Sequence, residues 1–101
     1  MASYQLTVLT PEGKIFENTV EELVAPGSTG MFGVLAKHAP MVAALQKGIL
    51  KIKQNSSEKF FAVEGGVLEV SSANQVLVLV DAAQEANSFS DAQQKLGALG
   101  K

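Results

Sequence analysis

Residues 59–80 read KFFAVEGGVLEVSSANQVLVLV, and this stretch decides the fold class. Three short apolar runs, at 59–63, 67–70 and 76–80, are separated only by Gly65-Gly66 and by a Ser/Asn-rich segment. Runs of this length bounded by turn formers are typical of β-strands, and the glycine pair is expected to break the first run. The third run has no polar alternation, so we expect both of its faces to be covered, as in a central strand between packed layers.

The same spacing extends over most of the chain. Tyr4, Leu6 and Val8 alternate with Gln5 and Thr7, which places one set of side chains toward a core and the other toward solvent. Further short runs lie at 14–17, 20–25, 33–35, 41–45 and 49–53. This pattern predicts an all-β domain, either a sandwich or a barrel.

Length and composition favour one ordinary globular domain and exclude several functions. The chain has 101 residues, 47% of them hydrophobic, and a formal charge of −2. Its eight basic residues are all lysines, so a phosphate-tracking surface and nucleic-acid binding are not expected. The absence of cysteine fits a reducing compartment, and the longest apolar run, 76–80, is far below the ~20 residues of a membrane-spanning helix. We therefore expect the chain neither to span nor to cross a membrane.

The C-terminal tail has a different pattern. Ser90 with Gln93 three residues later forms a capping box, which predicts one short helix beginning there. Two glycines among the last five residues predict that the end of this helix frays.

No motif in the chain predicts catalysis, a cofactor or a metal. His38 is the only histidine, and no second ligand lies at metal-binding spacing. Ser28 and Ser90 lie outside any nucleophile elbow, and 27–30 reads as a turn rather than a phosphate loop. The adjacent Glu21 and Glu22 point to opposite faces of a strand, so they cannot form an acid/base pair.

Met31 and Phe32 lie between glycines beside a polar loop. The plainer interpretation places at least one of them in the core, because single exposed apolar residues need no explanation. If both are exposed together at the loop tip, they resemble an interface anchor.

A set of short motifs, taken in order, resembles one family. The motifs are LTVLTPEG at 6–13, PGSTG at 26–30, GVL at 33–35, HAPM at 38–41 with Ala44-Leu45, GIL at 48–50, FAVEGGVLEV at 61–70 and VLVLVD at 76–81. Over about residues 4–86 this set resembles the epsilon subunit of F-type ATP synthases, which is homologous to the mitochondrial delta subunit.

The resemblance implies a ten-stranded sandwich of two five-stranded sheets at residues 1–86. It implies a non-catalytic central-stalk subunit that couples gamma to the c ring for proton-driven ATP synthesis and binds no cofactor. It would lie peripherally on the cytoplasmic face of a bacterial inner membrane, or on the equivalent stromal or matrix face. The implied c-ring contacts are Ser28, Thr29, Gly30, Met31 and Phe32, and the implied gamma contacts are His38, Ala39, Pro40, Met41 and Val42.

Two departures from the family pattern affect these expectations. Ala36-Lys37 replaces the Pro-Gly that many bacterial members carry before His-Ala-Pro, so the shape of this turn is open. Residues 87–101 stand in place of the usual two-helix domain, and 90–95 has no arginine where ATP-binding members carry an Asp and Arg motif. We therefore expect neither ATP binding nor a helical brake on ATP hydrolysis.

Two rival functions are weighed against the rotor subunit. A free-standing ligand-binding β-barrel requires polar residues directed inward around a cavity, and few are visible in the alternation pattern. An enzyme with His38 as its base requires acids or nucleophiles that converge on that histidine.

Overall fold

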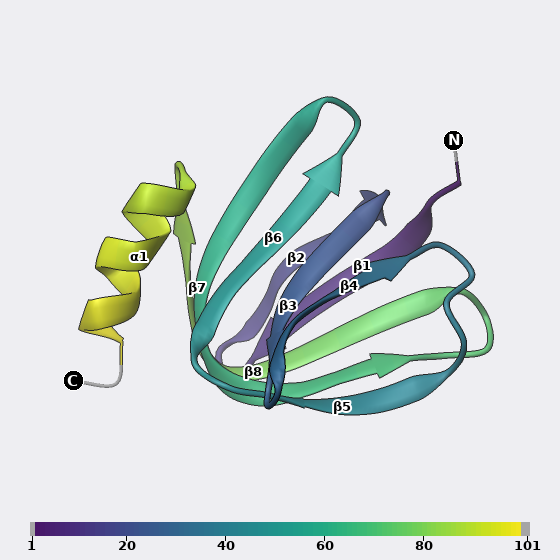
Figure 1. Ribbon diagram of the computed structural model, residues 1–101, viewed down its shortest axis with the longest axis horizontal. Coiled ribbons are helices and arrows are strands. Elements are labelled where there is room, and N and C mark those ends of the chain that lie inside the picture. The colour runs from purple at the N-terminus through teal and green to yellow at the C-terminus, as the bar shows by residue number, and fades with distance from the viewer. Residues whose placement is uncertain (1, 100–101) are drawn as a thin grey trace.

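The computed structural model describes residues 2–99 and confirms the all-β prediction (Figure 1). The strands are β1 Tyr4–Thr10, β2 Gly13–Val20, β3 Glu22–Gly27, β4 Gly30–Leu35, β5 Met41–Leu45, β6 Gly48–Gln54, β7 Ser57–Val70 and β8 Gln75–Ala86. One helix, α1 Phe89–Ala98, follows them. Every expected run lies in a strand, but the correspondence is not one to one: β7 joins the runs 59–63 and 67–70, and the run 20–25 is divided between β2 and β3. Most strands bury alternate side chains on one face, whereas β2 is largely exposed.

The strands form two layers, and the long strands β7 and β8 run through both. In the first layer the order is β2-β1-β8-β7-β5, using residues 75–80 of β8 and 66–70 of β7. In the second layer the order is β4-β3-β6-β7-β8, using residues 57–64 of β7 and 82–86 of β8. β7 and β8 therefore belong to both layers, and each layer has five strands. The eight strands thus agree with the expected sandwich of two five-stranded sheets.

The glycine pair bends β7 instead of ending it, which corrects the expected strand break. Gly65 and Gly66 have φ values of 28° and 155°, a region that favours glycine. A Cβ on Gly66 would lie 1.9 Å from the carbonyl oxygen of Leu79 on the neighbouring strand. The backbones of β7 and β8 thus approach closely at the bend, where both strands continue from one layer into the other.

The core between the layers is aliphatic, as the composition predicts. Leu6, Leu23, Leu50, Ile52 and Leu68 are among its fully buried side chains, and no charged side chain of the described residues is buried with them. At roughly 1.5–3 kcal/mol for each such side chain, burial of this core is the main stabilising term.

The run 76–80 is covered on one face only, which corrects the expectation of two covered faces. Val76, Val78 and Val80 point into the core, whereas Leu77 is half-buried and Leu79 is exposed. The opposite face of the first layer therefore carries apolar side chains on the outside of the molecule.

The C-terminal helix begins two residues earlier than the capping pattern predicted. Ser88 is the N-cap, and its hydroxyl accepts a hydrogen bond of 3.0 Å from the Asp91 backbone N–H. The Asp91 carboxylate in turn accepts from the Asn87 N–H, so this reciprocal cap lies two residues upstream of the expected capping box. The expected fraying concerns a chain end that includes residues 100–101, which lie outside the described residues.

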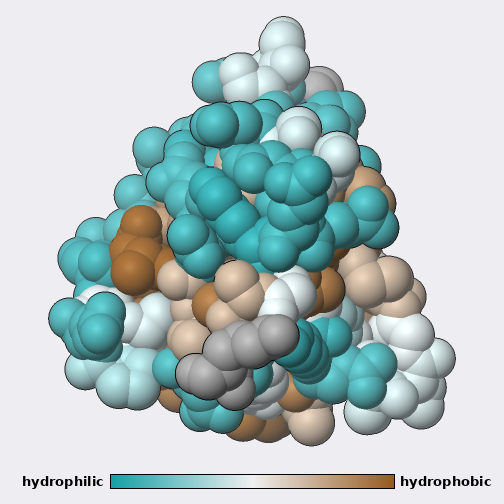
Figure 2. Space-filling model, turned by 90° about the vertical axis from the view of Figure 1, so that its left-hand side faces the viewer, coloured by the Kyte–Doolittle hydropathy of each residue, from teal (hydrophilic) through white to brown (hydrophobic). Residues whose placement is uncertain are grey.

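The helix α1 packs on the second layer through a small core of its own. Ala92 is fully buried against Ile49 and Ala86, with Phe60 and Leu96 at the edge of the cluster. The outer surface of the helix is mainly hydrophilic, as the space-filling view of this side shows (Figure 2). None of the helices described has the length and apolar character needed to cross a membrane.

Candidate functional site

The hairpin between β3 and β4 forms an exposed tip. Gly27 and Gly30 pair across it, which leaves Ser28 and Thr29 as a two-residue turn, and the φ of 133° at Gly30 suits a glycine. Ser28, Thr29 and Gly30 are all exposed.

The structure separates the roles of the two large apolar residues that follow this turn. Met31 is 56% exposed, whereas Phe32 is half-buried and packs against the core. The Phe32 ring also covers Gly27, where a Cβ would lie 2.8 Å from it. The prediction that at least one of the pair is used in the core is therefore confirmed, and Met31 alone is available as an apolar contact at the tip.

The turn before β5 holds His38 and is tied to the loop between β7 and β8. The backbone N–H of Lys37, a residue with φ 64°, donates to the Asn74 side chain at 2.7 Å, and the Asn74 amide donates to the Ser3 carbonyl at 3.0 Å. Lys37 therefore adopts the left-handed conformation at the position where the family pattern has glycine, which settles the shape of this turn.

His38 makes a local contact with the residue that follows it. One ring nitrogen, Nδ1, lies 2.8 Å from the Ala39 carbonyl oxygen, so this nitrogen is engaged locally. Across residues 2–99, no group of three histidine or carboxylate side chains converges as a metal site.

The hairpin tip and β5 line one groove, which the sequence could not predict. Residues 27–32 form one wall, and Met41, Val42, Ala43 and Ala44 form the other, around a volume of about 420 Å³. Strands β3 and β5 pair only at Gly27 and Leu45, which brings the base of the hairpin next to β5. The residues assigned to the c ring and two of those assigned to gamma are therefore neighbours, whereas His38, Ala39 and Pro40 lie outside this groove.

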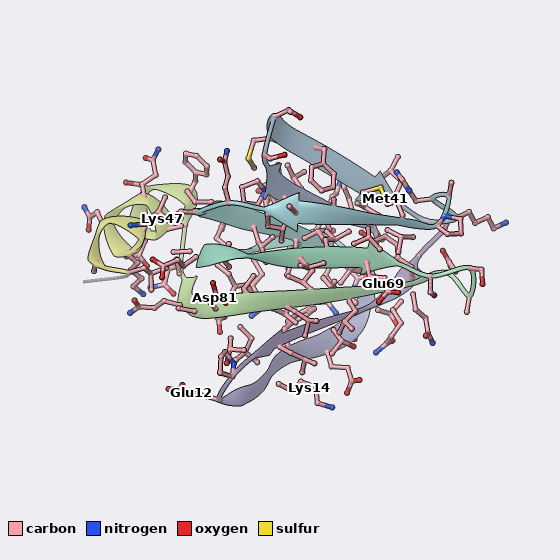
Figure 3. The ribbon with its side chains drawn as sticks, turned by 90° about the horizontal axis from the view of Figure 1, so that it is seen from below. Glu12, Lys14, Met41, Lys47, Glu69 and Asp81 are labelled. Atoms are coloured by element: carbon pink, nitrogen blue, oxygen red, sulfur yellow. The ribbon has the colours of Figure 1, made fainter. Side chains whose placement is uncertain are left out.

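A second exposed feature is the outer face of the first layer. Val42 is 70% exposed, Leu79 44% and Val67 40%, and all three side chains point away from the core. Figure 3 views the molecule from this side, with β5, β7, β8, β1 and β2 in succession. We call this surface, made of Leu9, Val42, Ala44, Val67, Leu77 and Leu79, the outer apolar patch. The sequence interpretation missed it because a run of consecutive apolar residues does not reveal which face is open.

Comparison with known proteins identifies the family. The model of the ATP synthase delta/epsilon chain beta-sandwich domain matches residues 3–86. The chain belongs to the ATP synthase delta/epsilon family. Among relatives, the ATP synthase epsilon chain of Leptospira interrogans is 40% identical over 77 residues, which cover 76% of this chain and 60% of that protein. The epsilon chain of Symbiobacterium thermophilum is 44% identical over 90 residues, which cover 88% and 64%.

Solved structures share the fold of this delta/epsilon-family chain. A chain of the Euglena gracilis mitochondrial ATP synthase superposes with a TM-score of 0.81 at 24% identity, covering 98% of this chain and 62% of that one. A chain of the central stalk and c ring of the Tetrahymena thermophila mitochondrial ATP synthase gives a TM-score of 0.70 at 17% identity, covering 94% and 88%. The resemblance stated from the motifs is therefore confirmed, although the chain spans only about three fifths of the length of the curated relatives above.

Proposed function

We propose that this chain is a non-catalytic central-stalk subunit of an F-type ATP synthase that joins gamma to the c ring during proton-driven ATP synthesis. Membership of the delta/epsilon family carries this proposal. The structure supports it with a close-packed sandwich whose exposed apolar groups include Met31 at the hairpin tip and Val42, Val67 and Leu79 on one sheet face, where a partner can reach them. In this role the chain lies peripherally at the membrane face that carries the catalytic head, and nucleotide chemistry takes place on other subunits.

The proposed contact with the c ring is the hairpin tip, residues 28–32. A turn of small polar residues suits the polar loops of a membrane ring, and Met31 adds one flexible apolar side chain that can fill a pocket there. Phe32 contributes by holding the tip rigid through its packing on the core.

The proposed contact with gamma begins at residues 38–42. The turn is fixed by Asn74, so His38, Ala39 and Pro40 are presented in a defined conformation ahead of Met41 and Val42. Pre-organised surfaces lose less conformational entropy when they bind, which favours a stable contact.

The alternative of a ligand-binding barrel finds little support. Its cavity would have to be lined by inward polar groups, but within residues 2–99 the core is filled mainly by aliphatic side chains, and the buried Tyr4 hydroxyl donates to the Val34 carbonyl. The openings among residues 2–99 are grooves on the surface, such as the one beside the hairpin tip.

The test replaces Met31 with Ser and measures co-purification with the c ring. We expect about tenfold weaker retention, because an exposed apolar anchor is lost while the Phe32 packing remains. The control is Leu35→Ser, since Leu35 is 59% exposed at the other end of the same strand. Equal retention of wild type and Met31→Ser would remove the tip from the interface, and failure of the wild type to join gamma and the ring would overturn the proposed function.

A further inference from the structure

Strand β4 forms an open edge of the second layer, because it pairs with β3 alone. Gly27 and Gly30 close a two-residue turn, so they form a hydrogen-bonded pair of the hairpin. Hydrogen-bonded positions alternate along an antiparallel pair, so from Gly30 onward every second residue of β4 bonds to β3. The backbone N–H and C=O groups of Met31, Gly33 and Leu35 therefore point away from β3, toward the open edge.

Two hydrogen bonds of neighbouring loops agree with this alternation. The Pro26 carbonyl accepts from the Gln46 N–H at 2.9 Å, so it points away from β4. The Leu35 carbonyl accepts from the His38 N–H at 3.3 Å, so it points away from β3. Among residues 2–99, the outward N–H and C=O groups of Gly33 have no hydrogen-bond partner. The edge thus presents unpaired backbone groups to solvent.

The side chains of this edge do nothing to prevent another strand from pairing with it. Residues 30–35 include no charged residue and no proline, and Met31 and Leu35 are 56% and 59% exposed. The edge strand β2 differs, because it carries Lys14 and Glu17 and its pairing with β1 contains a register shift. Charges and bulges are the usual devices that keep edge strands of different molecules apart. β4 has neither, so it can accept a further strand.

A second copy of β4 fits this edge in antiparallel register. When the two Gly33 residues face each other, Met31 of each copy faces Leu35 of the other, and all three pairs occupy hydrogen-bonded positions. Each Gly33 N–H then donates to the opposite Gly33 carbonyl, and each Leu35 N–H donates to the opposite Met31 carbonyl. The Met31 and Leu35 side chains meet on one face of the joined sheet, and no like charges are brought together within residues 30–35.

We propose that the free chain forms a two-fold symmetric dimer in which two β4 strands pair edge to edge and join the second layers into one sheet. The register identifies a second copy as the occupant, because this uncharged strand complements itself in both backbone and side chains. A six-residue contact is smaller than a stable interface, so we expect a weak dimer with a Kd of roughly 10–100 µM. Met31 also belongs to the proposed c-ring contact, so dimer and ring contact exclude each other; this consequence alone rests on the proposed function.

Sedimentation of the purified chain at about 5 to 500 µM tests the dimer, and we expect the average mass of wild type to rise from monomer toward dimer. Gly33→Pro removes an outward N–H and leaves the bonds to β3 in place, so it should weaken the dimer at least about tenfold. Gly33→Ala is the matched control. It keeps the N–H, and its Cβ would lie 3.6 Å from the nearest atom, so it should dimerise like wild type.

Leu35→Lys gives a second variant that keeps the glycine, with circular dichroism to verify the fold of each protein. Its charge should weaken the dimer as Gly33→Pro does. Hydrogen exchange followed by NMR then locates the contact. At about 500 µM, the outward amides of Met31 and Gly33 should exchange several-fold more slowly in wild type than in Leu35→Lys, whereas the amides of Phe32 and Val34, which bond to β3, should exchange alike.

Three results would overturn the dimer: wild type that stays monomeric at 500 µM, a dimer that persists in folded Gly33→Pro or Leu35→Lys, or amide protection confined to other segments. The last two results would indicate self-association through a different surface. Failure of wild type to join gamma and the c ring would defeat the proposed function and leave the dimer standing.

Discussion

At the scale of single residues, the turn before β5 shows how a departure from the family pattern is accommodated. Lys37 has φ 64° where many relatives are expected to have glycine, and its backbone N–H is held by Asn74. A non-glycine residue in this conformation is strained by about 1 kcal/mol.

Lys37→Gly is therefore expected to raise the free energy of unfolding by up to about 1 kcal/mol, because the strain is relieved while the bond from the backbone N–H to Asn74 is kept. Urea denaturation measures the change. Lys53→Gly is the control, since Lys53 lies in the extended strand β6 and glycine should lower stability there by about 1 kcal/mol. A loss of stability in Lys37→Gly would show that the strain is not relieved.

Tyr4 gives a second prediction at this scale, which concerns alkaline pH. Burial, and then the nearby Glu22 charge, raise the pKa of its hydroxyl, which donates a hydrogen bond of 2.7 Å to the Val34 carbonyl. The folded state thus favours the protonated phenol, so this contribution to stability is complete below about pH 10, the unfolded pKa, and is lost as the pH rises above it.

The chain has one tyrosine, so near-ultraviolet absorbance of tyrosinate reports Tyr4 directly. We expect it to ionise only together with unfolding, well above pH 10. Tyr4→Phe should lower stability at neutral pH by about 1 kcal/mol and remove the contribution of Tyr4 to alkaline unfolding. Reversible ionisation near pH 10 in the folded protein would contradict this prediction.

At the scale of elements, the bend in β7 depends on Gly66. A Cβ at this position would meet the Leu79 carbonyl at 1.9 Å and the Val80 Cα at 2.8 Å. Both atoms belong to the backbone of β8, so neither can rotate away.

Gly66→Ala should lower the free energy of unfolding by about 3 kcal/mol or more, measured by urea denaturation, because it adds conformational strain and forces the two strands apart. Gly13→Ala is the matched control. Gly13 also has a positive φ, of 126°, but nothing lies within 4 Å of its Cβ direction, so we expect a loss of only about 1 kcal/mol. Equal losses in the two variants would mean that the close approach to β8 has no effect.

At the scale of the whole molecule, the boundary at residue 86 remains a prediction. Helix α1 covers the second layer only through Ala92 and the few residues around it, whereas the main core lies entirely within the two layers.

A chain ending at Ala86 should therefore keep the sandwich and lose about 2 kcal/mol, because part of Ile49 and Phe60 becomes exposed to water. Circular dichroism would detect retained β-structure, and thermal unfolding would measure the loss. An unfolded product would show that the helix belongs to the same cooperative unit as the sandwich.

Much of the architecture follows from local sequence patterns. The features that could not be predicted in this way have physical causes that the structure identifies. The strands were predictable because apolar alternation marks a half-buried strand. The bend at Gly65-Gly66 was not, because a glycine pair can either end a strand or turn it. The helix start was ambiguous because both Ser88 and Ser90 have a capping partner three residues later, and the structure has Ser88 as the N-cap.

The candidate site was predictable only in part, for a related reason. The hairpin tip is local in sequence, so its exposed turn could be expected from glycine and serine alone. The groove beside β5 and the outer apolar patch depend on which distant strands pair and in which register. No local pattern contains that information, so the exposed side of Leu79 became evident only in three dimensions.

The passage of β7 and β8 through both layers has a mechanical consequence. In a sandwich whose sheets meet only through side chains, a tangential load can slide one sheet over the other. Here two unbroken peptide backbones cross the seam side by side, hydrogen-bonded on either side of the bend. A twisting force applied to one layer is therefore carried to the other by covalent bonds, and the domain resists shear as a single body.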